Sequence, residues 1–99
     1  MDSTDYDDIL LLGKVLNSKT CLLILQYLAS KDASNQELYE KLKNKTKISY
    51  RSSIFEALKR IKKAGLVEKY YNDEDKQIKY RLRYKTFSFD FGKLELEME

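Results

Sequence analysis

The sequence predicts an α+β fold in which the helices come first and a β-hairpin follows. Up to residue 64, apolar residues recur every three or four positions, which is the spacing of helices that bury one face. From Gln77 to Lys85, apolar and basic residues alternate strictly, as in a half-buried strand. The 99 residues contain no proline, repeat or linker, so residues 1–99 are expected to form a single domain.

Two helices are expected in the first third of the chain. The first extends from Asp5 to Leu16, has acidic residues near its N-terminus and carries apolar residues at Ile9 and Leu12. The second follows Ser18 and contains "CLLILQYL", so we expect it to be buried nearly all round. Cys21 lies in this helix and is expected to be a core residue, with an intersubunit disulfide as the alternative.

The third and fourth helices have recognisable ends. Ser34-Asn35-Gln36-Glu37 matches a capping box and predicts a short helix to about Lys43. The fourth helix begins at Ser49 or, by a second capping-box match, four residues later at Ser53. Gly65 is placed for a left-handed helix end. One side of this helix carries the apolar residues Ile54, Leu58 and Ile61.

The last third of the chain predicts strands. Leu66–Tyr71 and Gln77–Lys85, joined by the polar turn 72–75, are expected to form a hairpin. The phenylalanines at 87, 89 and 91 continue the alternation, so the second strand extends or a third one follows. "GKLELEME" also alternates but has a composition that suits a helix, and its state stays open. We expect residues 86–99 either to cover the core or to form a dimerisation surface with another chain.

The composition argues against several classes of protein. There is no histidine, so the usual general base and the commonest transition-metal ligand are both missing. No catalytic constellation and no glycine-rich phosphate loop is recognisable, so we expect neither an enzyme nor a bound metal or cofactor. No run of about 18 apolar residues occurs, and the acidic start differs from a signal peptide. We therefore expect a cytoplasmic protein with no membrane partner.

The positive charge is concentrated in the middle of the chain. The net charge is +3, but residues 43–69 carry nine basic residues and two acidic ones, a local net charge of +7. Residues 76–85 add five basic residues and no acid, whereas both ends of the chain are acidic. A cationic surface of this kind points to a polyanionic partner, such as double-stranded DNA.

Helices followed by a basic hairpin occur in this order in the winged helix-turn-helix, whose last helix lies in the DNA major groove and whose hairpin is the wing. The stretches "KVLNSKTCLLILQYLAS", "SNQELYEKL" and "SSIFEALKRIKKAGLVEKYYND" resemble the winged-helix transcription regulators of the ArsR-like group, over residues 7 to about 84. The strongest match is "LKRIKKAGLVEKYY", which is similar to the end of that group's recognition helix and its first wing strand. The resemblance implies an intracellular, dimeric DNA-binding regulator that remains associated with DNA.

Two departures limit what the resemblance implies. Metal-sensing members carry a cysteine pair in the helix before the recognition helix, and "SNQELYEKLKN" has neither cysteine nor histidine, so metal sensing is not carried over. The wing tip carries three acids, Asp73, Glu74 and Asp75, which do not suit contact with phosphate. We therefore expect the wing to act through basic residues on its second strand.

The helical angle of roughly 100° per residue separates two kinds of candidate contact. With Ile54, Leu58 and Ile61 facing inward, one outward stripe starts at Ser52. Short polar side chains near the N-terminal end suit base edges, and long cations suit phosphates. The predicted base-reading residues are Arg51, Ser52, Ser53 and Glu56, and the predicted phosphate-binding residues are Lys47, Lys59, Arg60, Lys63, Lys79 and Arg81.

Two neighbouring side chains of the fourth helix, Glu56 and Phe55, allow more than one interpretation. Glu56 either accepts a hydrogen bond from a cytosine amino group or pairs with a basic residue along the helix. Phe55 either packs against a neighbouring element or is an exposed aromatic that meets a base or sugar.

The predicted function is a sequence-specific, double-stranded DNA-binding transcriptional regulator that acts as a homodimer. Residues 49–64 of each subunit would enter successive major grooves about one helical turn apart, roughly 34 Å. The dimer surface would consist of the first helix and residues 86–98. The alternative is a winged-helix protein–protein interaction module of a larger assembly, whose basic face binds an acidic partner.

Overall fold

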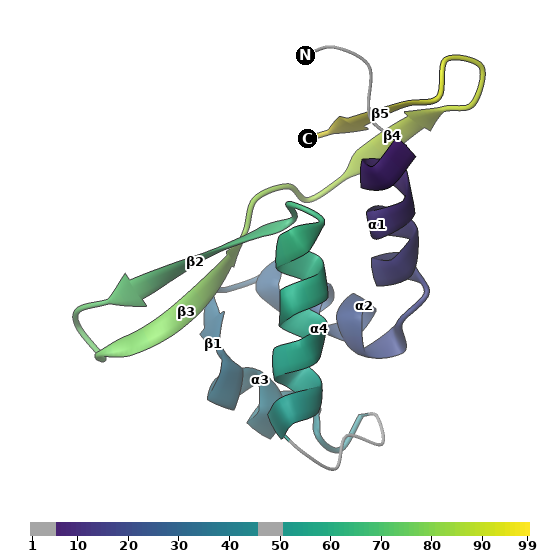
Figure 1. The fold of residues 1–99 in the computed structure, drawn as a ribbon. Coiled ribbons are helices and arrows are strands. Elements are labelled where there is room, and N and C mark those ends of the chain that lie inside the picture. Colours follow the sequence, from purple (N-terminus) through teal and green to yellow (C-terminus); the bar gives the residue numbers. More distant parts are fainter. Residues whose placement is uncertain (1–5, 46–50) are drawn as a thin grey trace.

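The helices precede the main hairpin along the chain, and the predicted α+β winged-helix fold is confirmed. The computed structural model describes residues 6–45 and 51–99 (Figure 1). Its elements in chain order are α1 (Tyr6–Leu16), α2 (Lys19–Leu28), β1 (Ala33–Ser34), α3 (Asn35–Leu42), α4 (Arg51–Lys63), β2 (Val67–Asn72), β3 (Gln77–Leu82), β4 (Phe87–Asp90) and β5 (Glu95–Met98).

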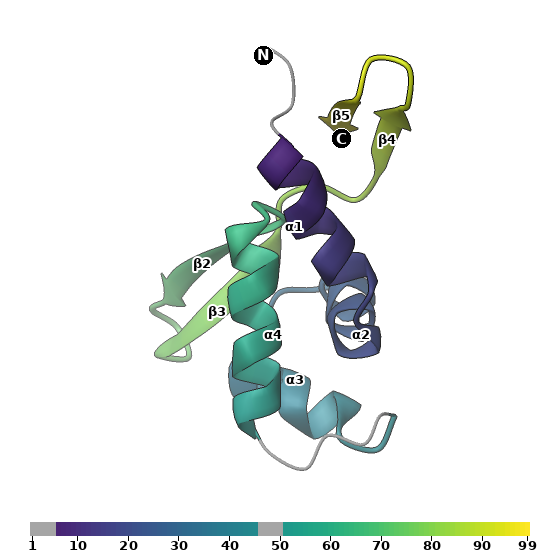
Figure 2. The same cartoon turned by 45° about the vertical axis from the view of Figure 1, so that its right-hand side comes forward.

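The wing is the antiparallel β2–β3 hairpin, which extends away from the helices (Figures 1 and 2). Its register runs from Val67 opposite Leu82 to Asn72 opposite Gln77. A strand that the sequence did not predict, β1, pairs with the other edge of β3 and places Ala33 opposite Tyr80. A strand of two residues is too short to show a period of two, so no sequence pattern marks it.

The predicted capping box of α3 and the glycine after α4 are confirmed, whereas the alternative start of the fourth helix at Ser53 is wrong, because α4 is already helical at Arg51. The Ser34 hydroxyl accepts a hydrogen bond from the Glu37 backbone N–H at 3.1 Å, and the Glu37 carboxylate accepts one from the Ser34 N–H at 3.3 Å, which completes the capping box of α3. Gly65 follows α4 with φ +79°, a conformation that favours glycine. The candidate start at Ser49 lies outside the described residues.

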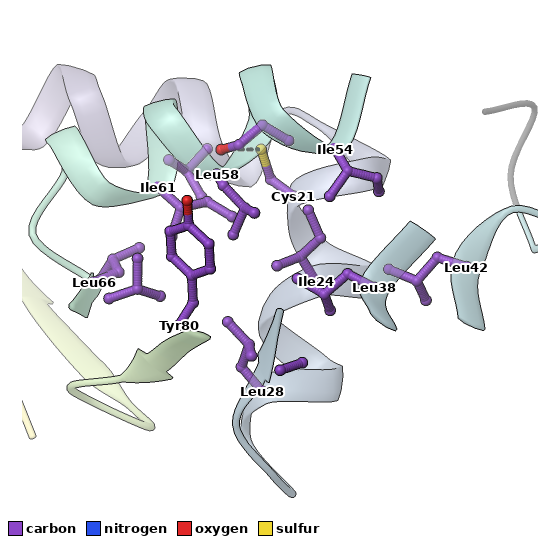
Figure 3. Close-up of a cluster of buried hydrophobic side chains, with 14 of the residues drawn as sticks. Cys21, Ile24, Leu28, Leu38, Leu42, Ile54, Leu58, Ile61, Leu66 and Tyr80 are labelled. Carbon is purple, nitrogen blue, oxygen red and sulfur yellow. Dashed lines mark hydrogen bonds between the residues drawn. The ribbon is translucent and has the colours of Figure 1, made fainter. Parts of the chain in front are cut away.

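The core is a cluster of aliphatic side chains between the helices and the inner face of the wing (Figure 3). The predicted inward residues of α4 are all buried, with exposed fractions of 0% for Ile54 and Ile61 and 1% for Leu58. Cys21 is fully buried, as predicted for a core residue, and its Sγ lies 3.9 Å from the Ala57 carbonyl oxygen. A thiol in this position cannot meet a second copy of itself without opening the core.

The prediction that α2 is buried nearly all round is wrong. Its neighbours α1, α3, α4 and β3 cover one side of the helix. The opposite side faces solvent, where Leu22 is 45% exposed. The high apolar content of this segment therefore overstates its burial, because composition does not show how many elements pack around a helix.

The C-terminal residues form a second hairpin, β4–β5, with Phe87 opposite Met98. This settles the open state of "GKLELEME" as a turn and a strand. The strand β3 ends at Leu82 and not at Lys85. The Arg83 N–H still donates to the Leu66 carbonyl at 2.8 Å, but the Lys85 N–H donates to the Glu99 carbonyl at 2.9 Å, next to the second hairpin. The second hairpin lies apart from the wing, near the N-terminal end of α1 (Figures 1 and 2).

Candidate nucleic-acid interface

The helix α4 is held in place by its inner face and presents the opposite face to solvent. Its buried side packs against α1, α2 and α3. Since 13 residues make more than three turns, the helix is long enough to carry a continuous outer stripe. The fixed inner face means that this outer stripe keeps one orientation relative to the wing.

The structure brings most of the predicted α4 residues together on this outer stripe, which we call the basic face. All of its members are exposed: Ser52, Ser53, Glu56, Lys59, Arg60 and Lys63. Arg51 is the first residue of α4, and nothing is described of its side chain. Lys47 lies outside the described residues. Hydroxyls therefore lie toward the N-terminal end of the face and cations toward the C-terminal end.

Glu56 and Phe55 both contact Lys59. The Glu56 carboxylate lies 3.9 Å from the Lys59 ammonium, and the two side chains are 64% and 61% exposed. The same ammonium lies 5.6 Å from the centre of the Phe55 ring, and Phe55 is 45% exposed. Exposed pairs of this kind contribute little to stability. Glu56 thus takes the pairing interpretation in the free protein, and Phe55 lies open to solvent beside the basic face.

Three cations of α4 have no acidic partner in the part of the chain that the structure describes. No carboxylate there lies within ion-pair distance of Arg60, Lys62 or Lys63. Lys62 is exposed and was not among the predicted contacts, because the outward stripe drawn at 100° per residue passes beside it. The high density of basic residues in "LKRIKK" is the sequence signal that would have placed Lys62 among the predicted contacts.

Lys79 on the wing, in contrast, is occupied by carboxylates. Its ammonium lies 2.7 Å from Asp75 and 3.6 Å from Glu37, and its side chain is only 15% exposed. The hydrogen bond to Asp75 raises the pKa of Lys79, with a further contribution from the negative charge of Glu37. Asp75 was read from the sequence as an obstacle at the wing tip, and the structure shows that its carboxylate neutralises a wing cation.

Arg81 belongs to a second cluster at the base of the wing. Its guanidinium Nε lies 3.3 Å from Glu68 and 3.9 Å from Asp32, and it stacks 4.5 Å from the centre of the Tyr70 ring. The Tyr70 hydroxyl donates a 2.6 Å hydrogen bond to Asp32, and this bond raises the pKa of Tyr70. Because Asp32 precedes β1 while the other residues lie on β2 and β3, the cluster ties the wing to the body.

A separate apolar surface lies at the other end of the molecule, and we call it the α1–β4β5 surface. On α1 it includes Tyr6 and Leu10, which are 66% and 62% exposed. On the second hairpin, Phe91 is 85% exposed and packs 5.2 Å from the Phe89 ring. Exposed aromatic and aliphatic side chains of this kind are typical of interaction surfaces.

Within residues 6–45 and 51–99, no three histidine, cysteine, aspartate or glutamate side chains converge as a metal ion requires. Over the same residues, no helix combines the length and apolar character needed to span a bilayer.

Comparison with known proteins places the architecture among winged-helix regulators. HlyU from Vibrio cholerae N16961 has a TM-score of 0.62 with this chain at 22% identity, over 78% of this chain and 76% of HlyU. The transcriptional repressor BigR from Xylella fastidiosa has a TM-score of 0.61 at 25% identity, over 78% of this chain and 71% of BigR. No family model matches the chain. A search of curated proteins found no match.

Proposed function

We propose that this protein is a transcriptional regulator of the ArsR-like group that binds double-stranded DNA in a sequence-specific manner as a homodimer. The main support for this proposal is the basic face of α4, whose cations are exposed. The opposite side of the same helix is fixed in the core. The shared fold with the transcriptional repressor BigR supports the same function. In the proposed complex, α4 lies in the major groove.

The proposal divides the contacts along α4. The N-terminal end, with Arg51, Ser52, Ser53 and Glu56, would read base edges, since short hydroxyls and a guanidinium reach hydrogen-bonding groups there. Glu56 would exchange its pairing with a lysine for a base contact. The phosphate contacts would come from Lys47 and from the exposed cations Lys59, Arg60 and Lys63.

The wing has a smaller part in the proposed complex than its sequence predicts. Lys79 and Arg81 are already paired with carboxylates in the free protein. A phosphate would have to displace these partners, so each contact would return less binding free energy than one from an unpaired lysine. We therefore assign the wing cations a structural role and the α4 cations the binding role.

The proposed dimer uses the α1–β4β5 surface. Its apolar side chains are exposed in the isolated chain, and covering them is favourable at roughly 25 cal/mol per Å². The surface lies away from the N-terminal end of α4 (Figures 1 and 2), so two subunits joined there would leave this end of both helices free. Lys63, at the other end of α4, lines a surface pocket together with Leu10 and lies beside the proposed contact. The rival function, a protein-interaction module, is favoured by the same exposed aromatics and requires no DNA.

Salt titration of duplex binding separates the two functions. Fluorescence anisotropy with a labelled duplex of random sequence should show log K falling linearly with log salt, with a slope of about −0.9 for each phosphate neutralised. The Lys59→Ala variant should bind more weakly and with a shallower slope. The matched control is Lys19→Ala, which removes an equal charge from the exposed start of α2. Absence of duplex binding at about 50 mM salt would refute the proposal in favour of the rival.

A further inference from the structure

A cavity of about 250 Å³ lies between the helices and the C-terminal part of the chain. The space is a pocket that opens to solvent, since exposed residues such as Ala29 and Lys85 form part of its lining. The walls are mainly apolar and come from α1, α2, β3, β4 and β5. Among the residues that line it are Leu12, Leu16, Leu25, Leu82, Phe87 and Met98.

The segment that connects the wing to the second hairpin forms one wall of the pocket and is hydrogen-bonded at both ends. At one end, the Arg83 N–H donates to the Leu66 carbonyl at 2.8 Å. At the other end, the Lys85 N–H donates to the Glu99 carbonyl at 2.9 Å, and the Glu99 N–H donates to the Thr86 carbonyl at 2.9 Å. These bonds hold the segment that carries the lining residues Tyr84, Lys85 and Thr86 beside the residue before β2 and the residue after β5.

The polar side chains at the cavity are few. They come from Gln26 on α2 and from Tyr84, Lys85 and Thr86 on the segment that connects the wing to the second hairpin. In the described part of the chain, no carboxylate lies within ion-pair distance of the Lys85 ammonium. The nearby Glu99 carboxylate instead lies 3.5 Å from the Thr86 hydroxyl. An apolar space with one unpaired cation beside it is complementary to an apolar molecule that carries one negative charge.

The volume limits the size of such a molecule. A 150 Å³ apolar protein cavity binds benzene, so 250 Å³ corresponds to roughly ten non-hydrogen atoms. Phenylacetate and octanoate both have this size and a single carboxylate.

We propose that this cavity is a binding site for small apolar carboxylic acids, with the hydrocarbon part between α1, α2 and the second hairpin and the carboxylate paired with Lys85. The site is distinct from the basic face, so ligand binding can be measured separately from DNA binding, but its walls on α1, β4 and β5 belong to the elements of the proposed dimer surface. Because Phe87 and Met98 line the cavity, a bound acid would hold β4 and β5 against the helices.

The test is a titration of the full chain with phenylacetate and octanoate. The readout is the position of the methyl signals of the lining leucines and Met98 in ¹H–¹³C NMR spectra. We expect saturable shifts confined to these methyls. The neutral counterparts, 2-phenylethanol and 1-octanol, should bind without contacting Lys85. Lys85→Gln should weaken binding of the acids by about threefold to fivefold and leave the alcohols unchanged, whereas Lys93→Gln, on the exposed turn of the same hairpin, should change neither.

A second variant tests the cavity itself. Ala29 lines the space at the end of α2 and is exposed, so a larger side chain can enter the cavity without displacing a buried neighbour. Ala29→Phe should abolish binding of acids and alcohols while the spectrum of the α4 methyls is retained. Lys85 is at the surface, so its variant remains informative if Ala29→Phe fails to fold.

Three results would overturn the proposal. One is the absence of saturable shifts up to millimolar acid. Another is a loss of binding in Lys93→Gln equal to that in Lys85→Gln. The third is a shift of the lining methyls with protein concentration and not with acid, which would show that a second copy of the chain occupies the space.

Discussion

The structure divides the predicted phosphate-binding cations into two groups, and this division predicts different salt dependences for their variants. Lys59 is 61% exposed and has one distant acidic partner at 3.9 Å. Lys79 is 15% exposed and has two partners, at 2.7 and 3.6 Å. If only exposed cations meet phosphates, Lys59→Ala should change the salt dependence of DNA binding and Lys79→Ala should not.

The expected size follows from counterion release. Each neutralised phosphate contributes about −0.9 to the slope of log K against log salt. The loss of Lys59 from both subunits of a dimer should therefore make the slope shallower by about 1.8. Between 50 and 200 mM salt, the affinity of the variant should therefore fall by about twelvefold less than that of the wild type. The slope is measured by fluorescence anisotropy with one duplex at five salt concentrations.

A third variant tests whether the carboxylate pairing of Lys79 keeps it from meeting a phosphate. Asp75→Asn removes the partner at 2.7 Å and leaves Glu37 in place, so Lys79 becomes partly free to meet a phosphate and the slope should become steeper. The claim that only exposed cations meet phosphates is refuted if Lys79→Ala makes the slope shallower by as much as Lys59→Ala does. It is also refuted if Asp75→Asn, after folding has been checked by circular dichroism, leaves the slope at the wild-type value.

Three further predictions concern specificity, stability and pH. Arg51→Ala should relax sequence preference in a selection from random duplexes, whereas Lys59→Ala should weaken binding to all sequences alike; equal effects would contradict the assignment. Leu58→Ala should cost about 2–5 kcal/mol in urea denaturation because the side chain is 1% exposed, while Leu94→Ala, at 40% exposure, should cost less than about 1 kcal/mol. The hydrogen bond from Tyr70 to its acceptor raises the pKa of Tyr70, so its stabilising effect is present below the ordinary tyrosine pKa and is lost as pH rises through the raised value. Thermal melts at increasing alkaline pH should show this loss of stability. In the Tyr70→Phe variant, the part of the pH dependence that comes from the Tyr70 hydroxyl should be absent.

The helices and the wing could be predicted from the sequence because each has a local signal. The capping box at Ser34, the apolar spacing of Ile54, Leu58 and Ile61, and Gly65 after the fourth helix all report on residues close together in the chain. These signals survive in the fold because the same residues also pack into the core. Local and tertiary preferences therefore agree along most of α3 and α4.

The features that were missed depend on contacts between distant residues. The pairing of Ala33 with Tyr80 joins segments 47 positions apart and leaves no periodic pattern. The exposure of Leu22 depends on which side of α2 other elements cover. The assembly of Asp32, Tyr70 and Arg81 likewise exists only after β1 has joined the sheet. Sequence spacing cannot report such contacts.

The charge pattern shows how this affects the candidate interface. In the sequence, residues 76–85 carry five basic residues without an acid, which suggests a strongly cationic wing. In the fold, the acids that pair with Lys79 and Arg81 lie on four other segments, at Asp32, Glu37, Glu68 and Asp75. Two of the five cations of this stretch are therefore paired, while Arg60, Lys62 and Lys63 find no such partners among the described residues. Unpaired positive charge attracts a polyanion, so the unpaired cations of α4 favour contact with DNA at this helix. The carboxylates beside Lys79 and Arg81 weaken the same attraction at the wing and so favour one orientation of the protein on DNA.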